Sequence, residues 1–247
     1  GLTRDSFPYI ISNGIEYQKI YQMQIGVICE QGDAPYFNEE VFSIMTPCSV
    51  LPTPWEERFD ENILEEQYCW TRYNGRISAY DTTYTEDLEL NSSWTVENVM
   101  LNGVNSQRLR ARVRGTDLKD WVVTPPINLG NQGNIKQIVF DLALRSSNSD
   151  MPTLCGDDDK FMVAFSLDNG VSWDIHNAIV FKNNDQDTLH NLSSFSNQPL
   201  PFSFKLVDEN NQPITGLIKI AFYVESTIAT TDNLLCIDNL SVEDWLE

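Results

Sequence analysis

Apolar and polar residues alternate with a period of two through most of the chain, and this alternation is typical of half-buried β-strands. The alternation is clearest over residues 21–29, 108–114, 140–144, 161–167, 218–224 and 235–242. No helical stripe longer than about two turns accompanies it. In the last stretch the apolar parity slips at Asp238-Asn239, which predicts a β-bulge at that point.

Turn-forming residues separate the expected strands. Asp168-Asn169-Gly170 lies between two apolar runs and predicts a hairpin, because Asn-Gly accepts the positive φ angles of a type I′ turn. Residues 128–134 and 208–213 are also rich in turn formers. Many strands, frequent turns and no intervening helices predict an all-β fold, an antiparallel β-sandwich.

A domain boundary is expected near residues 47–54, where Pro47, Pro52 and Pro54 interrupt the strand pattern. Residues 1–50 are too few and too interrupted to bury a core alone. We expect them to be either the end of a preceding immunoglobulin-like domain or extra strands packed on the main one. Residues 51–247 are expected to form the main sandwich.

The charge balance limits the kinds of partner that the sequence predicts. The chain has 16 Lys and Arg against 36 Asp and Glu, a net charge of −20. This balance argues against nucleic acid as a partner, because phosphate binding depends on a positive field. It suits an exported protein that is kept soluble by its charge, or one that holds Ca²⁺ with some of its carboxylates. No apolar run of about 18 residues occurs, so no membrane-spanning segment is predicted.

The five cysteines form neither a Cys-x-x-Cys pair nor a Cys/His cluster with zinc spacing. Cys29 and Cys48 flank a predicted hairpin, and one hypothesis is that they form a disulfide in an oxidising compartment. An odd number of cysteines leaves at least one free thiol.

Several segments together resemble a known family. They are Glu57-Arg58-Phe59-Asp60, Cys69-Trp70, the run Asp120 to Leu129 and the closing Ile237-Asp238-Asn239-Leu240-Ser241-Val242. In this order they resemble the cleaved-adhesin or choice-of-anchor J domains, MAM-like jelly rolls that include the adhesin domains of gingipains. Residues 15–50 resemble the final strands of a fibronectin type III-like domain.

This resemblance implies a jelly-roll sandwich over about residues 52–247. It implies a secreted protein or one on the bacterial outer surface, with other domains of a larger surface protein as neighbours. It further implies a role in adhesion, or as a non-catalytic appendage.

The resemblance also implies a structural Ca²⁺. The positions that match its carboxylate ligands are Glu57 and Asp238, and Asp60 and Asp159 are additional candidates. Ca²⁺ takes six to eight oxygen ligands, and neighbouring buried carboxylates need a cation to coexist. The alternative is that Asp238 bonds a neighbouring loop backbone. For the acidic run at residues 157–159, a solvated loop is the favoured interpretation.

Two sets of residues are candidates for ligand binding. Arg108, Arg110, Arg112 and Arg114 lie on one face of an expected strand and predict contact with an anionic glycan, an acidic partner or the protein's own neighbouring strand. Self-pairing is the favoured interpretation, and such exposed pairs are worth about 0–1 kcal/mol each. Tyr80 and Tyr84 are candidates for stacking on a sugar, although such residues more often anchor a loop.

The segment Ser166-x-Asp168-x-Gly170-x-Ser172-Trp173 matches the Asp-box of sialidases. A sialidase would need several copies on successive blades, so this single copy is interpreted as a structural hairpin with the tryptophan packed beneath it.

Catalytic motifs are absent from the sequence. The chain has only His176 and His190, and it lacks Gly-x-Ser-x-Gly, a His-Glu-x-x-His motif and a phosphate loop. The sequence does not exclude a glycosidase that uses two carboxylates, because any acidic chain contains the Asp and Glu residues for such a pair. The prediction is a non-catalytic module that recognises a glycan or an extracellular protein. The alternatives are an accessory carbohydrate-binding module of a larger secreted hydrolase or peptidase, or a structural spacer.

Overall fold

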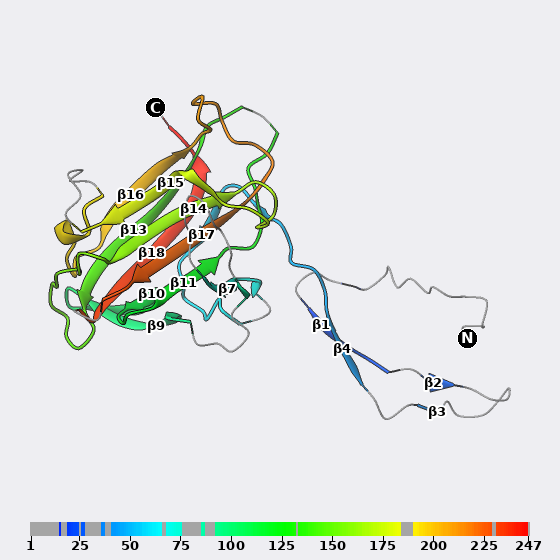
Figure 1. Cartoon of the computed structure of the whole chain (residues 1–247). Helices are drawn as coiled ribbons and strands as arrows, with labels where there is room; N and C mark the ends of the chain where they lie inside the picture. Colours follow the sequence, from blue (N-terminus) through cyan, green and yellow to red (C-terminus); the bar gives the residue numbers. More distant parts are fainter. Residues whose placement is uncertain are drawn as a thin grey trace. The chain divides into compact units, whose positions relative to one another are not determined.

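A computed structural model describes residues 15, 19–24, 26–27, 36–37, 41–65, 68–75, 85–86, 92–131, 133–183, 190–228 and 231–246. The chain forms two compact units, Gly1–Ser49 and Val50–Glu247 (Figure 1). In the described ranges, no helix has the length and apolar character needed to cross a membrane.

The first unit contains two short antiparallel ladders. β1 (Ile20–Met23) pairs with β4 (Phe42–Met45), and β2 (Gly26–Val27) pairs with β3 (Tyr36–Phe37). Side chains on β1 and β4, such as Ile20 and Ile44, are exposed. The similarity to a fibronectin type III-like domain stays a prediction for this unit.

The second unit is a β-sandwich, as the alternation predicts. One sheet has the strand order β16 (Leu200–Leu206), β13 (Lys136–Ser146), β18 (Asn233–Asp244), β10 (Val104–Val113) and β9 (Trp94–Leu101). β6 (Trp55–Glu57) also pairs with β18. All these pairings are antiparallel. We call this the arginine sheet. Arg108, Arg110 and Arg112 lie on the outer face of β10, and Arg114 follows the end of this strand.

The opposing sheet has the order β15 (Asp174–Lys182), β14 (Lys160–Ser166), β17 (Leu217–Ser226), β11 (Leu118–Val123), β7 (Thr71–Asn74) and β8 (Thr85–Glu86). β12 (Ile127–Asn128) pairs with β17 and, in parallel, with β5 (Leu51–Pro52). A short 3-10 helix, η3 (Leu192–Ser194), precedes β16. We call this the aromatic sheet, after the tryptophan and tyrosine side chains on its outer face.

The main core lies between the two sheets. Each sheet contributes alternate residues to it, including Leu109, Phe140 and Ile237 from one side and Phe161 and Phe222 from the other. Phe140 contacts both Phe161 and Phe222 across the sandwich, with ring centroids 6.4 and 5.8 Å apart. Burial of large apolar side chains at about 1.5–3 kcal/mol each is the main force holding the sheets together.

Two local predictions from the sequence are confirmed. The register between β13 and β18 shifts between Val139 and Asp141, opposite Asn239, whose φ is 48°. This is the β-bulge expected from the parity slip, and it lets both Ile237 and Leu240 face the core. The expected hairpin has positive φ at both central residues, 63° at Asn169 and 92° at Gly170.

The cysteines divide into two kinds. Cys48 and Cys69 are disulfide-bonded, and a bonded Cys69 was not expected from the sequence. Cys155 and Cys236 are free and buried. Cys29, one half of the expected pairing with Cys48, lies outside the described residues.

Candidate ligand-binding face

A second apolar layer lies on the outer face of the aromatic sheet. Because successive strand residues point to opposite faces, Val122 and Phe222 enter the main core while Trp121 and Tyr223 face outward. The register places four outward side chains in one row across four strands. In order, the row is Met162, Tyr223, Trp121 and Tyr73. At about 4.8 Å between strands, it extends for about 14 Å.

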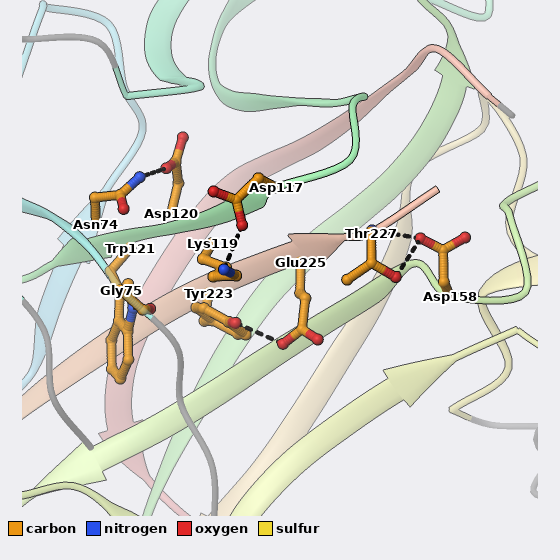
Figure 2. A network of polar contacts seen from close by, with 10 residues as sticks. All are labelled: Asn74, Gly75, Asp117, Lys119, Asp120, Trp121, Asp158, Tyr223, Glu225 and Thr227. Atoms are coloured by element: carbon orange, nitrogen blue, oxygen red, sulfur yellow. Dashed lines mark hydrogen bonds and ion pairs between the residues drawn. The ribbon is translucent and has the colours of Figure 1, made fainter. Parts of the chain in front are cut away.

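The aromatic members of this row contact one another and are fixed by hydrogen bonds. The rings of Trp121 and Tyr223 meet at 61°, with centroids 5.1 Å apart, an edge-to-face arrangement favoured by aromatic quadrupoles. Trp121 Nε1 donates to Gly75 O at 2.6 Å, and the Tyr223 hydroxyl donates to Glu225 Oε2 at 2.6 Å (Figure 2). Trp121 and Tyr223 are fully buried, whereas Tyr73 is partly exposed.

A row of small residues runs beside the aromatic row. Ala221 on β17 lies opposite Ala164 on β14 and Val123 on β11. Trp173, from the hairpin that follows β14, belongs to the same cluster, and its ring lies 5.7 Å from that of Trp121. Small side chains therefore leave room on this sheet face for an aromatic ring from a neighbouring hairpin.

A charged row flanks the aromatic row on its other side. Glu225 lies opposite Lys160 on one neighbouring strand and Lys119 on the other. Glu225 is buried, and Lys160 Nζ is 3.3 Å from its Oε2. Lys119 pairs with the exposed Asp117 (Figure 2). The face thus combines aromatic surface with fixed charges, the two kinds of group that orient a polar ligand.

The acidic run at residues 157–159 is tied down by backbone and hydroxyl donors. Asp158 Oδ2 accepts hydrogen bonds from the backbone N–H and the hydroxyl of Thr227 (Figure 2). It also accepts one from the backbone N–H of Ile228. Asp159 is buried and accepts from Gly156 N and the Thr231 hydroxyl. Burial raises the pKa of Asp159. This run is therefore a structured loop, and the expectation of a merely solvated one is wrong for Asp159.

The Asp-box segment forms the predicted hairpin. Asp168 accepts hydrogen bonds from the hydroxyls of Ser166 and Ser172 and from Ser172 N. The hydroxyl bond from Ser172 and the other donors lower the pKa of Asp168 to about 2. Trp173 is buried beneath the turn, so the structural interpretation of this motif is confirmed.

An acidic cleft of about 320 Å³ lies where β6 ends. Its lining residues are Glu56, Glu57, Arg58, Asp60, Glu61, Ile63 and Tyr68. Burial raises the pKa of Glu57, although Phe59 N donates to its carboxylate at 2.7 Å. The cleft brings Glu57 and Asp60, two of the positions expected for calcium, together with Glu56 and Glu61.

The four expected calcium ligands do not form one site. Burial raises the pKa of both Glu57 and Asp238, and the nearby charge of Asp60 adds to the rise in each, so these three share one neighbourhood. However, Asp238 forms an ion pair with Arg108. Asp159 bonds Thr231, which lies just before the first residue of β18. Within the described ranges, no group of three or more His, Cys, Asp or Glu could hold a metal ion. The calcium site stays a prediction, and Asp159 lies apart from it.

Each arginine of the predicted ladder has an acidic partner within the protein. Leu109, Ala111 and Val113 between them are buried, as the alternation predicts. The ion pairs, all on the arginine sheet or the loop before β18, are Arg108 with Asp238, Arg110 with Glu97, Arg112 with Asp232, and Arg114 with Asp232 at 3.6 Å. The self-paired interpretation therefore describes this face, and a ligand would have to compete with these partners.

The aromatic residues between residues 68 and 100 differ in where the structure places them. Tyr80 and Tyr84 lie outside the described residues. Trp70, part of the Cys69-Trp70 segment named in the sequence resemblance, packs against Phe59, 6.1 Å away, and is buried. Trp94 is also fully buried. The sequence analysis missed the row through Trp121 and Tyr223, although apolar residues at every position of 121–123 and 220–224 indicate strands buried on both faces.

Comparison with known proteins identifies no family. No protein-family model matches the chain, and no curated protein is similar to it. Among solved structures, the chain is similar to the K1 cleaved adhesin domain of Lys-gingipain from Porphyromonas gingivalis W83, with 14% identity and a TM-score of 0.45. That match covers 78% of this chain and 99% of the other.

Two further solved structures give similar values. The K3 cleaved adhesin domain of the same protein matches with 11% identity and a TM-score of 0.43, covering 76% of this chain and 96% of the other. The CBM22-1 xylan-binding domain of Xyn10C from Paenibacillus barcinonensis matches with 13% identity and a TM-score of 0.39, covering 80% and 97%. At such values, no function follows from these similarities.

Proposed function

We propose that the chain is a non-catalytic, extracellular binding module that recognises a glycan on the outer face of the aromatic sheet. The observation that carries this proposal is the in-register row Met162, Tyr223, Trp121 and Tyr73, with Glu225 and its two lysines directly beside it. Sugars present apolar C–H faces and many hydroxyls, and the partly exposed Tyr73 and the two lysines offer complementary aromatic and charged groups.

The accessible part of the face lies at its ends. Trp121 and Tyr223 are buried and act as a rigid floor, whereas Tyr73, Lys119 and Lys160 reach solvent. Hydrogen bonds hold the floor from two sides, through Gly75 O and Glu225. A ligand on such a face meets groups that are already oriented, which lowers the entropic cost of binding.

Several features support a binding role over a catalytic one. The free thiols of Cys155 and Cys236 are buried, and burial raises both pKa values, so neither is an activated nucleophile. The His190 ring packs on Phe181 with centroids 5.2 Å apart. The secreted or surface location, the larger parent protein and the adhesive role implied by the sequence resemblance belong to this same proposal.

Glycan-array screening of the purified chain, followed by titration calorimetry on the best neutral and acidic saccharides, tests the proposal. Tyr73→Ala should weaken binding about 2- to 12-fold, since an aromatic contact is worth about 0.5–1.5 kcal/mol. Arg114→Ala, on the outer face of the other sheet and exposed, is the matched control and should bind like the wild type. Equal losses in both variants, or binding to no glycan, would contradict the proposed face.

A further inference from the structure

We propose that Lys219 and Trp173 form a subsite for a carboxylate-bearing sugar beside the Asp-box hairpin. This inference rests on the proposed glycan-binding function and specifies its ligand class. The subsite lies on the outer face of the aromatic sheet, because Ile218 and Ile220, the neighbours of Lys219, point into the main core. Lys219 lies opposite Ser166, where the hairpin begins.

Gly170 is the point where the two side chains meet. A Cβ atom placed on Gly170 would lie 3.5 Å from Lys219 Cδ, 3.8 Å from Lys219 Nζ and 3.9 Å from Trp173 Cζ2. The ammonium group and the indole ring therefore reach within 4 Å of one position. Gly170 has a φ of 92°, a conformation that favours glycine, so the turn itself leaves this space open.

Among the described residues, neither the Trp173 indole N–H nor the Lys219 ammonium has an acceptor. Trp173 is 5% exposed, and its Nε1 is buried without a hydrogen-bond partner. An unsatisfied buried donor destabilises the folded chain, and a ligand oxygen would remove that cost. Lys219 is half-buried, and burial lowers its pKa. Lys119, Lys136 and Lys160, in contrast, each have an acidic partner.

The chemistry of these groups defines the ligand. Lysine and the indole N–H are donors only, so the complementary group is an acceptor, and a negative one best offsets the ammonium charge. Asp168 is not that acceptor, because Ser166 and Ser172 occupy its oxygens. The chain's net charge of −20 disfavours densely sulfated polymers. A single carboxylate on a sugar ring satisfies both donors beside an aromatic surface.

The indole N–H is covered in the free protein, and the Lys219 stem lies beside the same ring at Gly170. A ligand oxygen therefore reaches the N–H only after a neighbouring side chain moves, and the flexible stem of Lys219 is the group that would turn, so that the ammonium and the N–H both bind the carboxylate. The rotamer freedom that the lysine stem loses on ordering is offset by the charge-assisted hydrogen bond.

The test compares free acids with their methyl esters. Probes are polygalacturonate, alginate and 3′-sialyllactose, each used as the free acid and as the methyl ester that masks the carboxylate. Binding is measured by calorimetry for the wild-type chain, Lys219→Met and Trp173→Phe. Lys136→Met, on the arginine sheet and paired with Asp244, is the control. Thermal melts confirm that each variant is folded.

We expect the wild type to bind at least one free acid, and to lose 10-fold or more in affinity for its ester. Lys219→Met should lose a similar factor for the acid while binding the ester like the wild type. Trp173→Phe keeps the ring but lacks the donor, so it should lose affinity for both.

Equal binding of acid and ester by the wild type, or unchanged acid binding by Lys219→Met, would overturn the subsite. Binding of neutral glycans alone would also overturn it and would leave the proposed function intact. Binding to no glycan at all would contradict both the subsite and the proposed function.

Discussion

Arg108 and Asp238 form an ion pair between β10 and β18, with Arg108 Nε 3.1 Å from Asp238 Oδ2. Their side chains are only 6% and 15% exposed. Arg108 also donates from its Nη1 to Val99 O. The pair thus joins three neighbouring strands of the arginine sheet at the position where a calcium ligand was expected from the sequence.

Removing one partner of this pair should strongly destabilise the second unit. We expect Asp238→Ala to lower its free energy of unfolding by about 3–5 kcal/mol, because Arg108 would be left as an uncompensated buried charge. Urea unfolding followed by tryptophan fluorescence reports on this unit, since all six tryptophans lie beyond residue 50. Arg114→Ala should change the same quantity by less than about 0.5 kcal/mol, and an equally mild Asp238→Ala would contradict the assignment.

Calcium addition tests the metal site implied by the sequence resemblance. Ca²⁺ at about 100 times its dissociation constant should stabilise the folded chain by about 2.7 kcal/mol, seen as a rise in Tm over the value in EDTA. Glu57→Gln should abolish the rise, because Glu57 lies in the acidic cleft. Asp159→Asn should leave it unchanged, because Asp159 bonds elsewhere. Identical melting in EDTA and in millimolar CaCl₂ would rule out the site.

The Asp-box turn should be sensitive to acid. The pKa of Asp168 is about 2 in the folded chain and near its ordinary, higher value when unfolded. Its stabilising effect is therefore present above about pH 4 and is lost as the pH falls toward 2. Tm measured from pH 5 to pH 2 should show the wild type and Asp168→Asn converging at the acid end. A constant difference between them would show that Asp168 does not titrate in this range.

The free thiols should be inert in the folded chain. Burial raises the pKa of Cys236 to about 12 and also raises that of Cys155, so almost no thiolate exists at pH 8. Peptide mapping after iodoacetamide treatment should find both residues unmodified in native buffer and alkylated in 6 M guanidinium. Rapid native labelling of either residue would show that its burial is incomplete in solution.

Strand alternation predicts which face of a strand is buried, but not which strand lies beside it. Leu109, Ala111 and Val113 face the core as their spacing predicts. The partner of Arg108, however, depends on the register that sets Leu109 opposite Ile237, and no local pattern encodes that register. The row through Trp121 and Tyr223 could not be predicted for the same reason. Its members come from four separate strands, and only the folded sheet defines the order of these strands.

The edge of the arginine sheet has a consequence for how the chain behaves when concentrated. β16 ends the described strand order, and an open edge strand is a template for pairing with another copy. Pro201 has no N–H to offer, and Lys205 places an exposed charge one residue before the end of the same short strand. Both features oppose continuous hydrogen bonding between copies. Copies of the chain should therefore resist pairing along this edge when they are concentrated.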